Sequence, residues 1–300
     1  MLDFNNDIKL EFIGTQLVIE DLDIDVEITL TSEKTSNEAI VKIWNLSEKT
    51  KDIIRKDSTG IRILYKSESD SGYIPVFEGN KKNRIKTKKI KKNKPAKTHR
   101  KHKKKSTSST NAPETQRNID YETDGADEAL IVELGDNYLK YSTTHFKKTY
   151  KSAVSTKTII ADIANSFNVG IAYLDNVNHL SYGNGVAKQG EARSILSSVC
   201  DRIGCNWTLV GDMLVISSIK SKYSGKTIAY NFNGDNSEKP NFEDNDEVTF
   251  KTVLTPTVRP SDWCKLDFKD INGIFRSYTV KHSMSNYSEA NESEITVKEV

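Results

Sequence analysis

The first third of the chain alternates apolar and polar residues in several short runs. The clearest runs cover 8–12, 24–30 and 39–43, and two more cover 61–65 and 73–77. Successive side chains of a strand point to opposite faces, so this period of two predicts strands with one buried face and one face in water. The many Thr, Val and Ile residues in these runs favour the same structure.

A short helix is expected to interrupt these strands after the segment Trp44-Asn45-Leu46-Ser47. Ser47 has the side chain of a helix N-cap, and Glu48 follows in the first turn. Ile53 and Ile54 then supply the apolar contacts of the helix. We therefore expect one small helix packed on the strands.

The middle of the chain changes to helical periodicity. Ser155 or Thr156 is expected to cap a helix with a buried face made of Ile159, Ile160, Ile163, Ala164 and Phe167. The stretch 190–218 predicts a second helix that ends near Gly204 and then a two-stranded hairpin turning at Gly211-Asp212. The apolar stripe of this second helix consists of Ala192, Ile195, Leu196, Val199 and Ile203. With short strands expected at 170–174 and 180–182, the segment 153–222 is predicted to form a small α/β module with two helices on one small sheet.

The last part of the chain returns to strand patterns, at 227–232, 247–253, 264–268, 275–281 and 293–297. Asn272-Gly273 is the strongest short hairpin signal in the chain, and we expect the turn between the third and fourth of these strands there.

The segment 80–126 breaks the pattern. It has almost no apolar residues, and a basic run is followed by Ser, Thr, Asn and Pro and then by an acidic stretch. This composition is typical of disorder, and strands are expected to resume at 130–134 and 144–150. The sequence therefore predicts an α+β, mainly β fold in which two antiparallel β-barrel-like domains, 1–152 and 223–300, flank the α/β module. The segment 80–126 is expected as a long disordered basic insertion in the first domain.

Charge is distributed unevenly. The chain has 44 Lys and Arg against 42 Asp and Glu, a net charge of +2, but residues 81–105 alone hold 15 basic residues and no acidic one. Without them, 29 basic residues face 42 acidic ones, so the rest of the chain carries about −13. The protein is an acidic body with one basic arm.

Three cysteines in 300 residues imply no disulfide framework, which fits synthesis in a reducing cytosol. The N-terminus lacks the basic and apolar regions of a signal peptide, and no stretch approaches the roughly 20 apolar residues that cross a bilayer. We therefore expect assembly in the cytoplasm without use of the secretory route.

Two segments have the outline of a ligand site. Gly185 and Gly190 have the outer spacing of a phosphate loop, but Glu191 follows where the motif needs Lys, and a carboxylate there repels phosphate. Cys200 and Cys205 are spaced like half of a zinc site, as are His99 and His102, but four ligands in two suitable pairs are missing. The first segment is better explained as the loop before a helix, and the cysteines, with Cys264, as small buried side chains.

Catalytic patterns are also missing. A nucleophile would need one of His145, His179 or His282, and neither a G-x-S-x-G nor an H-E-x-x-H segment occurs. A pair of carboxylates of the glycosidase type stays open, because Asp and Glu are abundant and scattered. We expect no enzyme activity, no cofactor, no small-molecule substrate, and no catalytic, cofactor-binding or metal-binding residue.

The basic arm 81–105 allows three interpretations. It can be a solvated loop, it can contact an acidic protein or a membrane, or it can bind nucleic acid without sequence preference by releasing counterions. Aromatic residues for base stacking are absent from 81–119, and the acidic body would repel a polyanion. These observations favour the solvated loop over nucleic acid.

Three segments, in order, resemble parts of bacteriophage baseplate or tail hub proteins, the adaptors between tail tube and spike. SNEAIVKIWNLSEKT is similar to the strand ending in "IxNLS" of their first β-domain, and TIIADIANSF with GEARSILSSVCDRIGCNWTLVGDMLVI is similar to their inserted α/β region. LTPTVRPSDWCKLDF and GIFRSYTVKHSMSNYSEANESEITV resemble their closing β-domain. There, Ser261 replaces the usual Gly after Pro260, and the spacing from Val280 to His282 is shorter than usual.

This resemblance implies a structural virion protein of the phage tail. It implies a homotrimer whose two β-domains per subunit form a ring with pseudo-sixfold symmetry between the tail tube protein and the central spike protein, with the tape measure and other baseplate proteins as further neighbours. No individual site residue is implied. The alternatives are a nucleic-acid-binding protein acting through 81–105 and a tail-associated cell-wall hydrolase.

Overall fold

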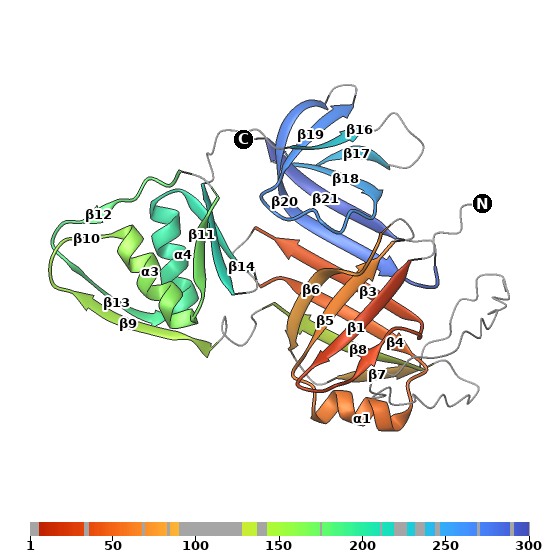
Figure 1. Ribbon diagram of the computed structural model, residues 1–300. Coiled ribbons are helices and arrows are strands. Elements are labelled where there is room, and N and C mark those ends of the chain that lie inside the picture. Colours follow the sequence, from red (N-terminus) through yellow and green to blue (C-terminus); the bar gives the residue numbers. More distant parts are fainter. Residues whose placement is uncertain are drawn as a thin grey trace.

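The computed structural model consists of two β-rich parts stacked on one another and a helical module beside them (Figure 1). It describes residues 6–32, 36–67, 70–82, 85–89, 128–136, 143–174, 176–210, 212–218, 227–231, 238–243, 247–268, 271–288 and 291–299. The fold is mainly β, as the sequence predicts.

The described residues of the N-terminal β part form eight strands and one helix. The strands are β1 (Asp7–Ile13), β2 (Val18–Ile19), β3 (Ile24–Thr31), β4 (Glu38–Trp44), β5 (Gly60–Lys66), β6 (Ile74–Lys81), β7 (Lys86–Lys89) and β8 (Glu128–Gly135), and α1 (Glu48–Lys56) lies between β4 and β5. Their order in the sheet is β3-β4-β8-β6-β5-β1-β2, with β7 beside β8. The alternating apolar residues of β1, β3 and β4 point inward, which confirms the strands predicted from the period of two.

The C-terminal β part is built around one long strand. Its strands are β16 (Thr227–Asn231), β17 (Glu238–Glu243), β18 (Glu247–Val253), β19 (Trp263–Phe268), β20 (Ile271–Ser285) and β21 (Glu292–Glu299). β20 pairs with β19 through its first half and with β21 through most of its length, and β16 lies parallel to β19.

The second half of β20 joins the two β parts into one sheet. Thr279 to Ser285 pair antiparallel with Thr31 to Asp25 of β3, so the sheet runs without interruption from β17 to β2. The inward residues of both parts form a single hydrophobic cluster. Among the described residues no sheet closes on itself, and the barrel-like form of the two domains therefore stays a prediction.

The helical module has its own small sheets and its own core. Its elements are β9 (His145–Tyr150), β10 (Val154–Ser155), α3 (Thr156–Phe167), β11 (Gly170–Tyr173), β12 (Ser181–Tyr182), β13 (Val186–Glu191), α4 (Ala192–Arg202), β14 (Cys205–Val210) and β15 (Met213–Ser218). Ser155 caps α3 through a bond to the main chain of Thr158, as predicted. Gly204 has a positive φ of 65° where the sequence predicted the end of α4. β14 and β15 form the predicted hairpin, and β11 lies parallel to β15.

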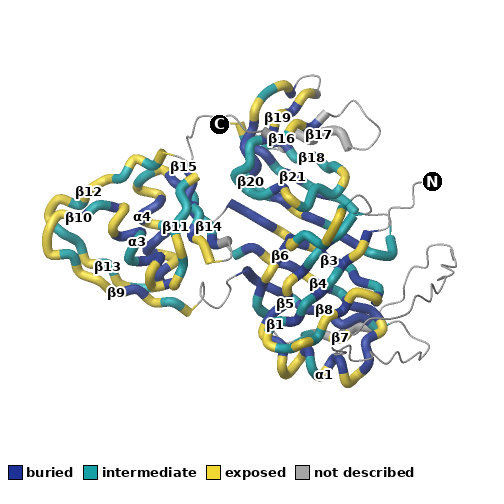
Figure 2. Tube along the Cα trace, in the orientation of Figure 1, coloured by how far each residue is buried: buried dark blue, intermediate teal, exposed yellow. Residues whose placement is uncertain are grey.

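The module buries a hydrophobic core of its own, to which α3 and α4 contribute buried residues (Figure 2). The apolar faces of α3 and α4 are buried against three small sheets and not against the single sheet that the sequence predicted. Phe167 and Leu196 are almost fully enclosed there. This core is a separate cluster from the one shared by the two β parts. The predicted buried face of α3 is confirmed, as are the stripe residues Ala192, Ile195, Leu196 and Val199 of α4.

The strand at 144–150, predicted to belong to the N-terminal β-domain, has a different partner. β9 pairs along its whole length with β13 of the module. Only Phe146 of β9 is buried, and it packs into the core of the module. Tyr150 also packs against this core and donates its hydroxyl to Asp162 of α3. These contacts, with the main-chain bonds to β13, place β9 in the module, and the pattern of β9 alone does not specify them.

The predicted turn at Asn272-Gly273 is wrong in position. Both residues lie inside β20, where they pair with Asp267 and Leu266, and β20 already begins at Ile271. This register places Ile271 and Phe275 on the same inner face as Leu266. A turn at Asn272-Gly273 would shift the register, and burial of the apolar side chains therefore outweighs the local turn preference.

The insertion begins later than predicted. Residues 80–81 belong to β6, and β7 pairs with Ile131 to Glu128 of β8, so part of the basic run extends the sheet. The edge of β8 offers main-chain partners to any sequence, and a charged strand is a common choice at such an edge. Residues 90–127 lie outside the described residues, as do His99 and His102.

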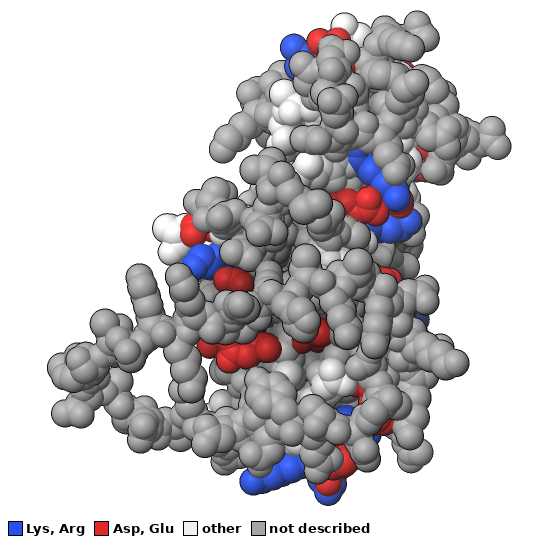
Figure 3. All heavy atoms as spheres, turned by 90° about the vertical axis from the view of Figure 1, so that its right-hand side faces the viewer, with Lys and Arg blue, Asp and Glu red and all other residues white. Residues whose placement is uncertain are grey.

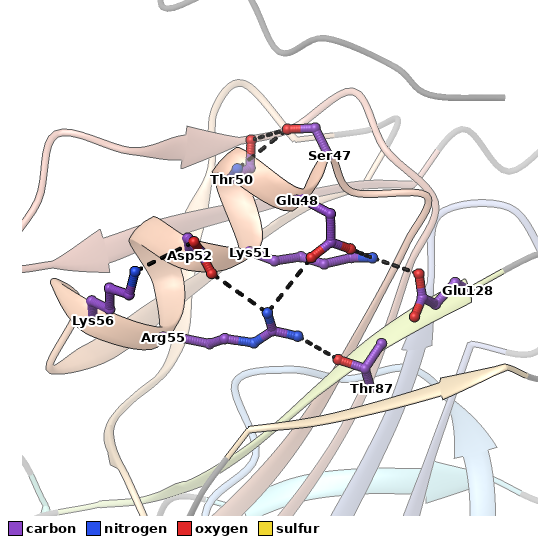
Figure 4. A network of polar contacts seen from close by, with 9 residues as sticks. All are labelled: Ser47, Glu48, Thr50, Lys51, Asp52, Arg55, Lys56, Thr87 and Glu128. Atoms are coloured by element: carbon purple, nitrogen blue, oxygen red, sulfur yellow. Dashed lines mark hydrogen bonds and ion pairs between the residues drawn. The ribbon is translucent and has the colours of Figure 1, made fainter. Parts of the chain in front are cut away.

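Helix α1 is fixed to the sheet by a buried charge (Figure 4). The Lys51 side chain is only 3% exposed, and its Nζ atom lies 2.8 Å from Glu48 and 2.6 Å from Glu128 at the start of β8. Burial lowers the pKa of Lys51, but the bonds to Glu128 and Glu48 outweigh it and the pKa is raised. Arg55 extends the network by bonding Thr87 of β7, and Ser47 caps the helix as predicted.

Replacing Lys51 with Met should lower the free energy of unfolding by about 2 kcal/mol, because the charge-assisted bonds to Glu48 and Glu128 are lost while both carboxylates keep contact with water. Urea unfolding followed by circular dichroism measures this loss. Lys56→Met is the matched control, since Lys56 is 71% exposed and pairs only with Asp52; its effect should stay within about 0.5 kcal/mol. Equal losses for the two variants would contradict the assigned role of Lys51.

A buried histidine should make stability depend on pH. His282 of β20 is 1% exposed, and its Nδ1 atom lies 2.9 Å from the Ser293 hydroxyl. Its Nε2 atom is buried without a hydrogen-bond partner in the described structure. Burial, assisted by the charge of Arg259, lowers the pKa of His282 from 6.5 to about 4. The neutral ring is therefore the folded form.

Because the unfolded chain then binds the extra proton, stability should be complete above pH 6.5 and decline as the pH falls toward 4. The shift corresponds to about 3 kcal/mol over this window. His282→Asn cannot titrate, so its unfolding free energy should fall less steeply between these pH values than that of the unchanged protein. Exposed His145→Asn is the control and should keep the full slope.

Candidate functional site

A network of polar contacts lies where the three parts of the chain meet, in the turn between β18 and β19. Its residues 255–262 fold back through a bond from the Val258 N–H to the Thr255 carbonyl, 3.1 Å long. Ser261 has a φ of 77°, a conformation that favours glycine. This geometry gives a physical reason for the Gly that the family pattern has at that position.

Arg259 ties this turn to the N-terminal β part. Its guanidinium donates to the carbonyls of Pro256 at 2.6 Å and Val258 at 3.1 Å within the turn, and to the carbonyl of Val76 in β6 at 3.4 Å. Its main-chain N–H donates to the carboxylate of Asp262 at 2.8 Å. Burial lowers the pKa of Arg259 and raises that of Asp262, so both charges lie in a poorly solvated place.

Arg276 ties the same turn to the module. Its Nη1 atom donates to the carbonyl of Ser218, the last residue of β15, at 2.8 Å, and its Nε atom donates to the carbonyl of Ser261 at 3.4 Å. Ser217 and Ser261 face each other with their hydroxyl oxygens 3.5 Å apart. Ser277 completes the junction by donating its hydroxyl to the carbonyl of Arg259.

A cleft of about 790 Å³ opens beside this junction. One wall is β6 of the N-terminal β part. The facing wall is the side of the β11-β15-β14 sheet that the helices do not cover. Figure 1 shows β14 next to β6. Val215 and Leu174 contribute apolar surface to the module wall, and Leu174 is 51% exposed.

The candidate ligand-binding residues of the sequence, the segment 185–190 and the cysteines, do not line this cleft. The segment expected as a loop before the helix, 185–190, mostly belongs to β13, and Glu191 accepts bonds from Arg193 and Ser194 at the start of α4. The cysteines Cys200, Cys205 and Cys264 are buried thiols, and no disulfide joins them.

The three histidines of the described structure lie apart in different elements. His145 is exposed on β9, His179 stacks edge-on against Tyr173, and His282 is buried under Ser293. Within the described residues no group of three or more His, Cys, Asp and Glu side chains is placed to hold a metal ion. No helix of the described part is long and apolar enough to cross a membrane.

Charged side chains of both signs mix on the surface. On the face shown in Figure 3, the described basic and acidic residues lie next to one another in small groups. Ion pairs between neighbouring strands also bring opposite charges together, such as Lys42 with Glu27 at 2.6 Å and Lys281 with Glu294 at 2.7 Å.

Sequence reasoning missed both arginines of the junction. In the sequence, Arg259 lies between Pro256 and Pro260 in an expected turn, and Arg276 lies in an expected strand. Their partners are main-chain carbonyls, and that of Arg276 lies 58 residues away in the chain. A carbonyl is present in every residue, so no residue pattern points to it.

Solved structures of phage tail proteins have a similar fold. The chain is similar to the 43 kDa tail protein of prophage MuSo2 from Shewanella oneidensis, with a TM-score of 0.60 and 9% identity over 97% of this chain and 96% of that chain. It is also similar to a tail protein from Neisseria meningitidis, with a TM-score of 0.62 and 11% identity over 98% and 97% of the two chains.

A third similar structure is an E. coli component of the type VI secretion system, described as resembling the T4 bacteriophage tail proteins gp27 and gp5. Its TM-score is 0.60, with 8% identity over 97% of this chain and 76% of that chain. No protein-family model and no curated protein sequence matches the chain. At these identities the likeness establishes the fold alone, which this chain shares with solved phage tail proteins, and the resemblance found in the sequence is confirmed at the level of the fold.

Replacing Ser261 with Gly should raise the free energy of unfolding, because glycine adopts the positive φ at that residue without strain. The left-handed conformation costs other residues about 1 kcal/mol, from which the loss of the contact with Ser217 and the greater freedom of the unfolded chain subtract. We expect a net gain of about 0.5 kcal/mol, measured by urea unfolding.

Ser261→Ala separates the two contributions, because it removes the hydroxyl and keeps the strained backbone. This variant should be less stable than the unchanged protein. If Gly and Ala lowered stability equally, the hydroxyl and not the backbone would determine the residue at this position.

Proposed function

We propose that this protein is a structural component of a phage tail, a baseplate hub that forms a trimeric ring and joins the tail tube to the central spike. The observation that carries the proposal is the agreement in fold over 96–97% of two phage tail proteins, which leaves almost no part of either chain unmatched. The order of the three sequence segments supports the same assignment.

In this proposal the two β-rich parts build the ring, so that three subunits present six such parts to a hexameric tube. The continuous sheet through β3 and β20 supports this role, because it holds both parts of one subunit in a fixed orientation. The module 153–222 acts as a spacer beside the ring. The protein is not an enzyme, resides in the virion tail after assembly in the host cytoplasm, and contacts tube, spike, tape measure and other baseplate proteins.

The solution mass and the particle image test this proposal together. We expect a trimer by sedimentation or mass photometry, and a ring with pseudo-sixfold symmetry in electron micrographs of the full chain. A protein that remains a monomer at micromolar concentration and forms no ring with its tube partner would contradict the hub assignment.

The same purified protein can be used to test the alternative function, nucleic-acid binding through the basic arm 81–105. Adding salt to a DNA-binding assay of the full chain, and of a chain without 81–119, should reveal no tight binding that depends on the arm. Tight binding that weakens steeply with salt and vanishes on deletion would instead support a nucleic-acid role for the basic arm.

A further inference from the structure

Several basic side chains of the helical module have no carboxylate partner among the described residues. Elsewhere on the surface, Lys42 and Lys281 lie 2.6 and 2.7 Å from carboxylate oxygens, and within the module Lys148 and Arg193 are paired in the same way. The remaining basic side chains of the module have no ion pair in the part of the chain that the structure describes, and they are Lys147, Lys151, Lys157, Lys188 and Arg202.

Two of these cations meet at one aromatic ring. The Nζ atom of Lys188, on β13, lies 5.2 Å from the centre of the Tyr182 ring, and the Cζ atom of Arg202, at the end of α4, lies 4.2 Å from it. Tyr182 is held in place, because it pairs with Val154 in the β10–β12 sheet and packs against the core of the module. The π-electrons of the ring attract each cation but do not cancel its charge. A fixed ring therefore holds two positive charges side by side.

The neighbouring side chains do not neutralise this pair. Lys148 lies opposite Lys188 in the β9–β13 pairing, and its own partner Asp162, at 2.7 Å, also accepts the hydroxyl of Tyr150 at 2.6 Å. Arg202 lies in the last turn of α4, where the helix dipole favours a cation. The dipole gives a structural reason for Arg202 but none for Lys188, which lies on a strand. Two like charges held together in this way favour the binding of an anion from outside the module.

The Tyr182 site, which we define as Tyr182, Lys188 and Arg202, is open to other molecules. Figure 1 shows β10 and β12 at the end of the module that points away from the β-rich parts. Arg202 is exposed and Lys188 is half-buried. A partner can therefore reach both cations without displacing any part of the described chain.

The chemistry of the site indicates which anion fits. The planar guanidinium of an arginine matches a carboxylate with two parallel bonds, and a lysine ammonium acts as a compact point charge beside it. Proteins that bind single-stranded nucleic acid use free aromatic faces for base stacking and a long basic groove along the backbone. The Tyr182 ring packs against the core and is approached by two cations, so it is a poor stacking platform. The site suits a short segment with carboxylates better than a nucleic acid.

We propose that the outer end of the module binds an acidic segment of another protein at the Tyr182 site. One Asp or Glu side chain of the segment bonds the Arg202 guanidinium, and a second lies against the Lys188 ammonium. The module thereby gains a contact of its own, in addition to its place as a spacer beside the ring. The site is defined within one module, so the proposal does not depend on the hub role.

Chemical cross-linking of an acidic peptide to the full chain tests this binding. The probe is acetyl-Gly-Asp-Glu-Asp-Glu-Gly-amide, and a carbodiimide couples its carboxylates to lysine amines that they contact. Mass spectrometry of the digested protein assigns each adduct to its lysine, so adducts on the basic arm are counted separately. We expect an adduct at Lys188 whose yield saturates with peptide below about 1 mM, the upper end of weak specific binding.

Lys147 is the internal control, because it is exposed on β9 and also has no ion pair in the described structure. The yield at half-buried Lys188 should exceed that at Lys147 by about tenfold or more, the effect of one charge-assisted bond. Greater accessibility alone would give the opposite order. This comparison uses the unchanged protein and therefore needs no variant to fold.

Variants of Arg202 test whether the two cations act together. Arg202→Gln should lower the Lys188 yield about tenfold and leave the Lys147 yield unchanged, whereas Arg202→Lys keeps the charge and should retain most of the Lys188 yield. Because Arg202 is exposed, circular dichroism of both variants should match that of the unchanged protein.

Three results would overturn the proposal. The first is an equal yield at Lys188 and Lys147, and the second is a Lys188 yield that does not respond to Arg202→Gln. The third is loss of the Lys188 adduct when a single-stranded oligonucleotide is added at a lower concentration of charge than the peptide, because the ligand would then be a nucleic acid.

Discussion

The pairing of β3 with β20 is the interaction on which the rest of the structure depends. These strands are about 250 residues apart in the chain, and their seven paired residues turn two β-rich parts into one sheet. The register places Val280 and Met284 of β20 on the same inner face as Leu30 and Val26 of β3. Since a slip of one residue would turn these side chains outward, the shared core and the pairing fix each other.

A change of partner along β20 follows from this constraint. The strand pairs with β19 up to Arg276 and with β3 from Thr279, and its pairing with β21 is irregular between Ser277 and Thr279. Such an irregularity bends a strand and re-aims its side chains. Arg276 and Ser277 lie at this bend, and they hold both the turn 255–262 and the end of β15. The place where the sheet changes direction is therefore also the place where the module is attached.

This attachment explains why a cleft exists. The module has its own core, so its helices need no contact with the body to be stable. It meets the body through the junction at Ser217 and Ser218, and the outer face of its small sheet stays apart from β6. The module is an insertion between the two β parts, so it can be attached to them at one end and leave a cleft beside that attachment.

Local patterns in the sequence predicted most of the elements, and the failures share one cause. Alternation located β1, β3 and β4, and capping residues located α1 and α3, because these signals lie within about ten residues. The partner of β9, the β3–β20 pairing and the bond from Arg276 to Ser218 join distant segments, and no local signal specifies them. At Asn272-Gly273 a local signal was present, but burial of Ile271 and Phe275 determined the register instead.

The difference between local signals and distant contacts also helps to explain why this chain shares its fold with proteins that have very few identical residues. Two segments that resemble tail hub proteins contain non-glycine residues at positive φ, Asn45 and Ser261, so these short motifs report backbone shape more than chemistry. The junction itself is made largely of arginine bonds to main-chain carbonyls, which any residue supplies. A fold specified by alternation, a few turns and two arginines places weak demands on most residues, which is compatible with 8–11% identity to structures of the same fold.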